Sequence, residues 1–169
     1  AGEVADFSPL SCLTGLTELS LSARSPITSL SFLSGLTGLK SLSIGSYDVT
    51  LSDFSDLAGL TRLESLTLYP RGVTSLTGLE CLTDLRELNL SGDGSYPDLD
   101  PLAGLHSLET ISLPHNETVP YDTSGLAGLT KVKDLSLSGT VANLDGLATM
   151  TGLESLSISS VYPDYPALD

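Results

Sequence analysis

Apolar residues recur along the chain in one pattern, L-x-x-L-x-x-L-x-x-L-x-L, in which steps of three are followed by a step of two. Steps of three are typical of a helical turn, and a step of two is typical of a strand. The pattern therefore predicts a short helical turn that leads into a short strand. Seven copies occur, and they begin at Leu10, Leu33, Leu57, Leu79, Leu102, Leu126 and Leu147.

The copies follow one another at intervals of 21 to 24 residues, the spacing of a solenoid built from short repeated units. Each unit has one leucine face that it cannot bury alone, so its neighbours must complete the core. Further apolar residues, again in steps of three, lie between each strand and the next helical turn, as in Val73, Leu76 and Leu79. We expect these return segments to fill the interior opposite the strands.

The same half-pattern stands before the first copy, at Val4 and Phe7, and after the last, at Tyr162, Tyr165 and Leu168. We therefore expect one domain over residues 1–169, with partial repeats at 1–9 and 159–169. A solenoid needs terminal units with a polar outer face. Because neither end has one, we expect the chain to be excised from a longer one, with flanking protein or further repeats over one or both ends. In the alternative, the partial repeats themselves cover the ends, with Asp6 at one and Asp164 and Asp169 at the other.

Composition and charge exclude several classes of function. The 169 residues carry 7 Lys and Arg against 21 Asp and Glu, a formal net charge of −14, which disfavours binding to nucleic acid or to an anionic membrane. Aromatic residues make up only 5%, so the core must be aliphatic. No apolar run approaches the roughly 18 residues of a membrane span, so we expect no membrane insertion.

The segment from Val4 to Leu19, Val-Ala-Asp-Phe-Ser-Pro-Leu-Ser-Cys-Leu-Thr-Gly-Leu-Thr-Glu-Leu, resembles the bacterial, internalin-like subclass of the leucine-rich repeat family, and Asp98–Leu105 repeats its main features. The resemblance spans the whole chain. It implies an α/β solenoid, a right-handed superhelix with about seven parallel strands on the concave face and short helical or 3-10 turns on the convex face. The bias to Leu, Ala, Gly, Ser, Thr and Asp also resembles, in composition, the repeat tails of bacterial NACHT or other STAND-type sensor ATPases.

The chain departs from the family in the turn after each strand. The family usually places Asn three residues beyond the last strand leucine, where its side chain binds backbone groups of neighbouring turns. Here Asn116 alone matches, so the backbone amides of the other turns must be satisfied differently, and we expect irregular loops. The seven positions are Arg24, Tyr47, Arg71, Asp93, Asn116, Thr140 and Val161.

The candidate binding site lies at this loop edge. The middle of the concave face is small and polar, and it lacks the aromatic and arginine side chains that dominate interface energies. Five of the six tyrosines adjoin a proline, a combination of stiff backbone and amphipathic ring that suits recognition. For Tyr96, Tyr162 and Tyr165, which stand on apolar steps, we expect the ring to turn inward. The predicted partner-binding residues are Arg24, Tyr47, Tyr69, Arg71, Asp93, His115 and Asn116.

The two cysteines, Cys12 and Cys81, occupy the same position of repeats that are three turns apart. At roughly 4.8 Å per turn they would be about 14 Å apart, beyond the reach of a disulfide. We expect two unpaired, buried thiols, which favour a reducing compartment.

The motifs do not indicate an enzyme, a metal site or a cofactor. His106 and His115, the two histidines, are expected on different faces, and no nucleophile elbow, Walker sequence or zinc-ligand spacing is present. Acidic loops such as Asp93, Asp98 and Asp100 lack the spacing of a calcium-binding EF-hand, and we interpret them as solvated charge.

We interpret the chain as a non-catalytic protein-recognition module with a protein ligand of unknown identity. The leading hypothesis is the ligand-sensing or partner-binding segment of a larger bacterial sensor protein in the cytoplasm. The alternative is an extracellular internalin-like adhesin or spacer at the cell surface. An accessory domain of an enzyme whose active site lies elsewhere is a third class.

Overall fold

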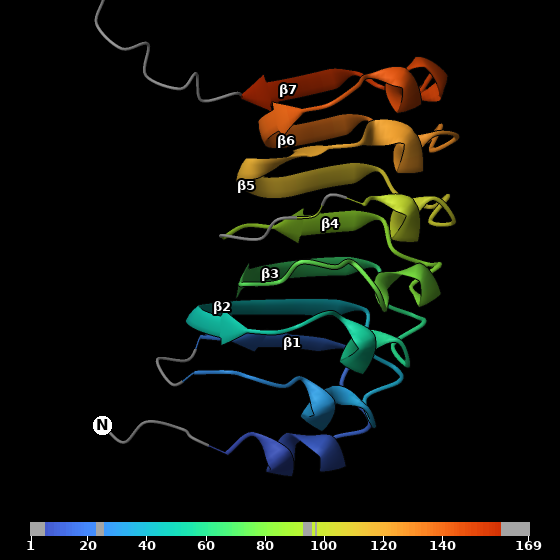
Figure 1. Cartoon of the computed structure of the whole chain (residues 1–169). Helices are drawn as coiled ribbons and strands as arrows, with labels where there is room; N and C mark the ends of the chain where they lie inside the picture. Colours follow the sequence, from blue (N-terminus) through green and yellow to red (C-terminus); the bar gives the residue numbers. More distant parts are fainter. Residues whose placement is uncertain (1–5, 23–25, 93–95, 97, 160–169) are drawn as a thin grey trace, which may run out of the picture.

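The computed structural model describes residues 6–22, 26–92, 96 and 98–159, and it leaves out the side chains of residues 46–48, 117 and 118. Strands and 3-10 turns alternate along the chain and lie on opposite sides of one stack (Figure 1). The strands are β1 (Glu18–Leu21), β2 (Ser41–Thr50), β3 (Ser65–Arg71), β4 (Glu87–Leu90), β5 (Thr110–Tyr121), β6 (Asp134–Val141) and β7 (Ser155–Ser159). The 3-10 turns are η1 (Ser8–Cys12), η2 (Ser31–Leu33), η3 (Ser55–Leu57), η4 (Leu79–Cys81), η5 (Asp100–Leu102), η6 (Thr123–Leu126) and η7 (Asp145–Thr149).

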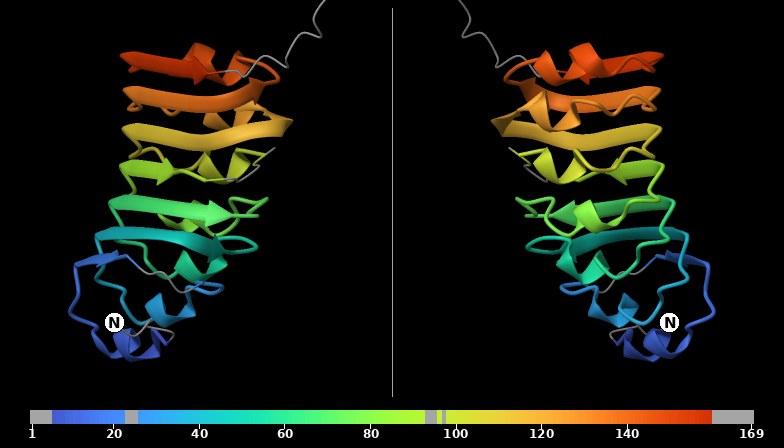
Figure 2. Two further views of the ribbon diagram at one scale, coloured as in Figure 1. Left: turned by 90° about the vertical axis from the view of Figure 1, so that its left-hand side faces the viewer. Right: turned by 90° about the vertical axis from the view of Figure 1, so that its right-hand side faces the viewer.

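The strands form one parallel sheet in chain order, β1 to β7 (Figure 2). Their register follows the leucine pattern, because equivalent residues of successive repeats are paired. The paired residues at the centre of the sheet are Ser20, Ser43, Thr67, Asn89, Ser112, Ser136 and Ser157. The predicted solenoid of seven parallel strands and short 3-10 turns is thus confirmed. Among the described residues, no helix has the length and hydropathy to cross a membrane.

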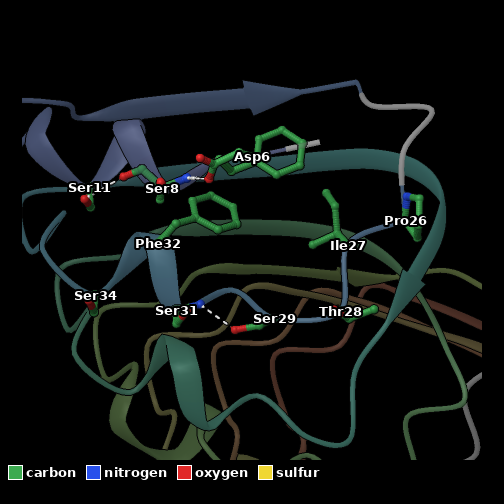
Figure 3. Close-up of a pocket in the computed structure, with 11 residues that line it drawn as sticks. Asp6, Ser8, Ser11, Pro26, Ile27, Thr28, Ser29, Ser31, Phe32 and Ser34 are labelled. Carbon is green, nitrogen blue, oxygen red and sulfur yellow. Dashed lines mark hydrogen bonds between the residues drawn. The ribbon is translucent and has the colours of Figure 1, made fainter. Parts of the chain in front are cut away.

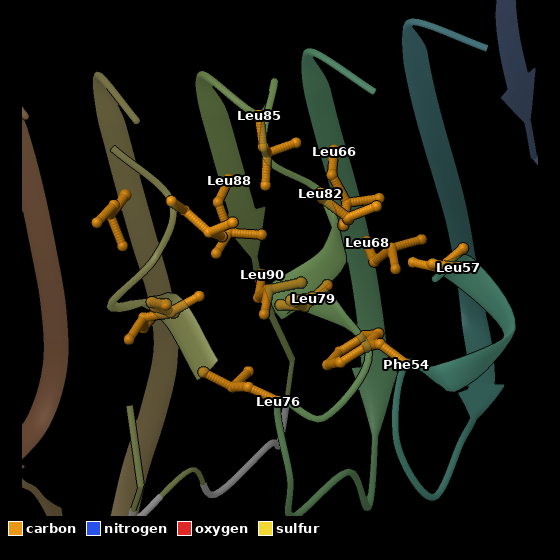
Figure 4. Close-up of a cluster of buried hydrophobic side chains, with 14 of the residues drawn as sticks. Phe54, Leu57, Leu66, Leu68, Leu76, Leu79, Leu82, Leu85, Leu88 and Leu90 are labelled. Atoms are coloured by element: carbon orange, nitrogen blue, oxygen red, sulfur yellow. The ribbon is translucent and has the colours of Figure 1, made fainter. Parts of the chain in front are cut away.

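The core is a set of aliphatic columns that run along the solenoid axis (Figure 4). Each column holds the equivalent residue of successive repeats; Leu66 and Leu88, for example, are fully buried neighbours in one of them. Burial of a leucine side chain contributes about 1.5–3 kcal/mol. Because each leucine packs against the turns on both sides, this stabilisation comes from stacking and not from the single turn.

The two end turns are less well buried than the turns between them. Leu13 of the first turn is 48% exposed, and Leu144 and Leu156 of the last turn are 54% and 48% exposed. Their equivalents in the middle turns, such as Leu36 and Leu66, are fully buried. The exposure at the ends follows from the lack of a stacked neighbour among the described residues.

Several strands are longer than the leucine pattern predicts. The additional backbone hydrogen bonds of these strands replace those that the asparagine side chains of the resembled family would make. β2 and β5 run to Thr50 and Tyr121, well past Ile44 and Leu113, the last apolar residues of the leucine pattern in these strands. The register shifts after Ile44 and after Leu113, so the irregularity falls in the segment where it was expected. Backbone bonds then satisfy these segments; the N–H of Thr50, for example, donates to the carbonyl oxygen of Ile27 (2.9 Å).

Glycine allows the closest approach of neighbouring turns in this region. Gly139 has a φ of +109°, and an added Cβ would collide with the backbone of Asn116. Gly92 has a φ of +130° and lies equally close to the carbonyl of Pro70. A left-handed backbone and the lack of a side chain are both needed there, which only glycine supplies without strain.

A second polar column starts the 3-10 turns. In each repeat, a side-chain oxygen four residues before the first leucine of the pattern accepts the backbone N–H two residues ahead, at 2.8–3.3 Å. Such short side chains stabilise turns because they satisfy an N–H that has no helical partner. The residues that supply this oxygen are Asp6, Ser29, Asp53, Ser75, Asp98, Asp122 and Asn143.

Charges alternate along the opposite edge of the sheet, one residue before each strand from β2 to β7. Two pairs are in contact, Lys40 with Glu64 at 2.7 Å and Arg86 with Glu109 at 2.9 Å. All four side chains are substantially exposed, so each pair contributes only about 0–1 kcal/mol. The column places three of the seven cations on this edge, and its residues are Lys40, Glu64, Arg86, Glu109, Lys133 and Glu154.

Acid should weaken the turn column at Asp122. The Ser124 hydroxyl, the Asn143 amide and the Ser124 backbone N–H lie 2.6, 2.8 and 2.9 Å from one Asp122 oxygen and lower the pKa of this carboxyl from 3.8 to about 2. The carboxylate therefore stabilises the fold above pH 3.8, and this contribution is lost as the pH falls towards 2. We predict that Asp122→Asn reduces the fall in melting temperature across this pH interval.

The measurement is thermal unfolding by circular dichroism at a series of pH values. Asp84→Asn, at an exposed position on the helical side, is the matched control and should keep the wild-type slope. Equal slopes for wild type and Asp122→Asn would contradict the prediction.

Candidate functional site

The loop edge of the solenoid comprises the residues that follow the leucine pattern in each repeat. The pattern ends at Leu21, Ile44, Leu68, Leu90, Leu113, Leu137 and Ile158. Of the predicted site residues, Arg24 and Asp93 lie outside the described residues, and Tyr47 is described only through its backbone, within β2. Tyr69, Arg71, His115 and Asn116 all lie on this edge, in β3 and β5. The structure therefore brings four of the predicted residues to one side of the sheet.

Tyr69 is the exposed anchor of this edge. Its side chain is 42% exposed although it lies in the middle of the solenoid. The other large apolar residues with high exposure belong to the end turns, with the exception of Val119, which is 38% exposed. Tyr69 and Val119 are thus the two strongly exposed large apolar residues, among those described, whose exposure is not explained by an open end.

Arg71 lies two residues beyond Tyr69 and ends β3. Its side chain is exposed, and its backbone is held in the sheet opposite Thr50. It is the one described cation on the loop edge, because Arg62, Lys131 and the cations of the alternating column lie before the strands. An arginine beside an exposed tyrosine combines the two side-chain types that most often anchor interfaces.

Asn116 shapes the loop edge from inside. It is 2% exposed, and its side-chain amide binds both backbone groups of Val119: Oδ1 accepts the N–H at 3.0 Å, and Nδ2 donates to the carbonyl oxygen. The one asparagine at the family position therefore folds its own loop back and presents Val119 to solvent. Asn116 was predicted as a site residue, and its burial means that it can act only through this loop.

His115 is half-buried and takes part in a chain of hydrogen bonds across three strands. Its Nδ1 lies 3.0 Å from the Ser138 hydroxyl, and that hydroxyl accepts a bond of 3.1 Å from Ser159. The bonds tie β5, β6 and β7 together at the loop edge.

His106 lies just after η5, on the helical side, so the two histidines are on different faces, as predicted.

Two tyrosine rings turn into the core, and the apolar steps predicted this for one of them. Tyr96 is fully buried, with its ring centroid 6.5 Å from that of Phe54, whereas Tyr162 and Tyr165 lie outside the described residues. Tyr121, which was not expected to turn inward, is also buried, and its hydroxyl donates to the carbonyl oxygen of Pro114 at 2.7 Å. Burial raises the pKa of both Tyr96 and Tyr121 far above 10.

The cysteines are only partly as predicted. Cys12 and Cys81 are unpaired, which confirms the prediction that they form no disulfide with each other. Both are exposed, so the prediction that they are buried is wrong. The error arises because the position two residues after the first leucine of each repeat faces solvent, as it does at the equivalent residues Gly35 and Gly104.

A hollow of about 460 Å³ lies at the first turn, between η1 and the return segment before η2 (Figure 3). Its apolar lining includes Phe7 and Phe32, whose rings stack at 5.4 Å between centroids, and Ile27. The hollow is wide open. Val4, which occupies the position of Ile27 in the preceding repeat, lies outside the described residues, so we assign no ligand to the hollow. In the described part of the chain, no group of three or more His, Cys, Asp or Glu is placed to hold a metal ion.

Comparison with known proteins identifies the fold. Two solved structures of Listeria monocytogenes proteins are similar over almost the whole chain. The first, an internalin (inlF), has a TM-score of 0.79 and 29% identity, and the match covers 94% of this chain and 45% of the internalin. The second, internalin C2 (inlC2), has a TM-score of 0.75 and 29% identity, and the match covers 93% of this chain and 67% of internalin C2. The chain has the leucine-rich-repeat fold. A leucine-rich-repeat protein of Leptospira interrogans shares this fold at 20% identity and TM-score 0.61.

Among curated proteins, the leucine-rich repeat-containing G-protein coupled receptor 5 of Rattus norvegicus is 31% identical over 115 residues, which are 65% of this chain and 13% of the receptor. No protein-family model matches the leucine-rich-repeat chain. The chain thus spans only a small part of that receptor and less than half of the first internalin.

The exposure of Val119 and the role of Asn116 as a loop clamp were not predicted from the sequence. The available signal was the asparagine at the family position followed three residues later by Val-Pro-Tyr, a short aliphatic next to a proline in a polar loop.

We predict that Asn116→Ala releases this loop, because it removes both side-chain bonds to Val119. The amide hydrogen of Val119 should exchange about tenfold or more faster with solvent.

Hydrogen exchange followed by NMR measures this rate directly. Asn89→Ala, on the central strand face, removes an asparagine whose bond of 3.0 Å goes to Ser91, so it should leave exchange at Val119 unchanged. Unchanged exchange in Asn116→Ala, or equal acceleration in both variants, would contradict the clamp.

Proposed function

We propose that the chain is a non-catalytic protein-recognition module whose partner-binding site is the loop edge around Tyr69, Arg71 and Val119. The single observation behind this choice is the exposure of Tyr69 in the middle of the solenoid, where the stacked turns leave no other reason for it. A tyrosine contributes a large contact area with little loss of side-chain entropy, and Arg71 adds directed hydrogen bonds. His115 and Asn116 act behind this surface, through the strands and loop that they hold.

The remaining surface supports the same choice of edge. The centre of the strand face carries small hydroxyl side chains, such as Ser43, Ser112 and Ser136, which offer little area to a partner. At the start of the strands, the longer side chain of Glu87 already accepts a hydrogen bond from the Ser65 hydroxyl at 3.0 Å. With a net charge of −14, the chain has few places to meet an acidic partner surface, and Arg71 marks one of them.

Substitution of the two anchors tests this site. We predict that Tyr69→Ala and Arg71→Ala each weaken binding of the partner by about tenfold or more, the usual effect of truncating an interface anchor of these types. Both side chains are exposed, so the fold should persist. The partner is first captured from host lysate through a photo-crosslinking residue at position 69, and its dissociation constant is then measured with purified proteins by calorimetry.

Arg62→Ala and Arg86→Ala on the opposite side of the chain are the matched controls. Arg62 is exposed, and Arg86 takes part in one exposed ion pair, so both variants should fold and bind normally. If these two substitutions abolish binding while Tyr69→Ala and Arg71→Ala retain it, the partner binds the opposite side of the chain and the proposed site is wrong.

For the biological setting we propose the ligand-sensing or partner-binding segment of a larger bacterial intracellular sensor, with the compositional likeness to STAND-type repeat tails as one support. The exposed, unpaired thiols of Cys12 and Cys81 are a second, because exposed thiols persist best in a reducing compartment. The similarity to two internalins favours the second candidate, an extracellular adhesin or spacer module.

The same thiols distinguish the two settings. We predict that a membrane-impermeant maleimide fails to label Cys12 and Cys81 when it is added to intact host cells, and labels both after lysis, because their exposure makes them reactive once reached. The readout is mass spectrometry of the recovered protein. Labelling of both cysteines on intact cells would favour the internalin-like alternative and leave the proposed binding edge unaffected.

A further inference from the structure

The alternating column is a regular row of charges along the side of the stack on which the parallel strands begin (Figure 1). The backbone N–H of each residue in it, from Glu64 onward, donates to the carbonyl oxygen of the residue before it in the column at 2.7–2.8 Å. The charges are therefore held at fixed intervals of one turn, roughly 4.8 Å. Their sign changes at every step, in the order Lys40, Glu64, Arg86, Glu109, Lys133 and Glu154.

The two ends of the column differ in how their charges are used. At one end, the Lys40 ammonium contacts the Glu64 carboxylate at 2.7 Å, and the third and fourth charges form the second contact. Among the residues that the structure describes, Lys133 and Glu154 at the other end form no ion pair. Both residues are exposed, so their charges can meet those of another molecule.

The order of the charges is complementary to its own reverse. Because six charges alternate, a second copy that runs in the opposite direction places an opposite charge at every position. Lys40 then lies opposite Glu154, Glu64 opposite Lys133, and Arg86 opposite Glu109. A parallel copy in the same register would instead place like charges opposite one another. The column therefore favours an antiparallel arrangement of two copies.

The rest of the chain strengthens this preference. The column has no net charge, whereas the whole chain carries −14, so two copies repel each other over most of their surfaces. Opposite charges face each other where two reversed columns meet. A two-fold axis perpendicular to the solenoid relates such copies, and the assembly closes at two because each copy uses its one column.

We propose that the alternating column is the interface of an antiparallel homodimer, with the two-fold axis between Arg86 and Glu109. Lys133 and Glu154 of each copy, which form no ion pair within the chain, there meet Glu64 and Lys40 of the second copy. Both edges exclude water from these contacts, which strengthens the attraction relative to an exposed pair. The loop edge lies on the opposite side of the sheet, so the partner site proposed above stays accessible, and either proposal can fail without the other.

Charge reversal followed by sedimentation equilibrium of the full chain tests the interface. The wild type should dimerise, and Lys133→Glu and Glu64→Lys should each raise the dissociation constant of the dimer by about a hundredfold or more, because each places like charges opposite one another twice. The two substitutions change the net charge in opposite directions, so a loss of association in both is not an effect of net charge.

An equimolar mixture of the two variants should associate as tightly as the wild type. In the mixed dimer, every altered position faces a charge of opposite sign. Positions 64 and 133 are three turns apart within one chain, about 14 Å, so only contacts between chains can restore association. A variant that fails to fold could not be restored in this way.

Lys131→Glu and Asp84→Lys are the matched controls, since they make the same changes of charge at exposed positions on the helical side. Neither should weaken the dimer. A wild-type chain that stays monomeric over the accessible concentration range would overturn the proposal, and so would single variants that still dimerise or a mixture that does not associate. Growth of the wild type beyond two copies would overturn it as well, because a two-fold interface closes.

Discussion

The structure depends on the stacking of aliphatic side chains between successive turns. A single turn of this chain holds its leucines on one face and has nothing of its own to pack against them. Leu66 of β3 is fully buried because Leu42 and Leu88 lie on either side of it, and Leu156 of β7, with one neighbour among the described residues, is 48% exposed. Stability is therefore shared between turns, and the end turns receive less of it.

Polar groups follow the same periodicity because stacking brings equivalent backbone groups together in every turn. The side-chain acceptors of the 3-10 turns, from Asp6 to Asn143, recur once per repeat for this reason. The segments after the strands lack the asparagine ladder of the resembled family, and where they are described, as in β2 and β5, longer strands supply backbone hydrogen bonds instead. Asn116, the one residue at the family position, instead binds Val119 within its own loop.

The register of the sheet could be predicted from the sequence because leucine spacing and stacking specify it together. Ser20 and Ser157, at opposite ends of the sheet, pair with the residues that the leucine spacing places beside them, Ser43 and Ser136. Strand length could not be predicted, since it depends on the path of segments beyond the leucine pattern. The exposure of Cys12 and Cys81 was mispredicted because a column of small residues fits a buried position as well as a solvent-facing one. For the candidate site, the pattern indicated the correct edge for Tyr69 and Arg71, but the burial of Asn116 and the exposure of Val119 depend on a loop conformation that a one-dimensional pattern does not contain.

Exposure has two physical origins in such a fold, and separating them is what selects the binding edge. At an end, an aliphatic residue is exposed because its column stops, so Leu13, Leu144 and Leu156 indicate where another layer fits. In the middle, both neighbours are present, and Tyr69 is exposed because its side chain points away from the core and into solvent. An exposed ring in a complete stack contributes nothing to the core, and its position on a rigid strand holds it ready for a partner at little entropic cost.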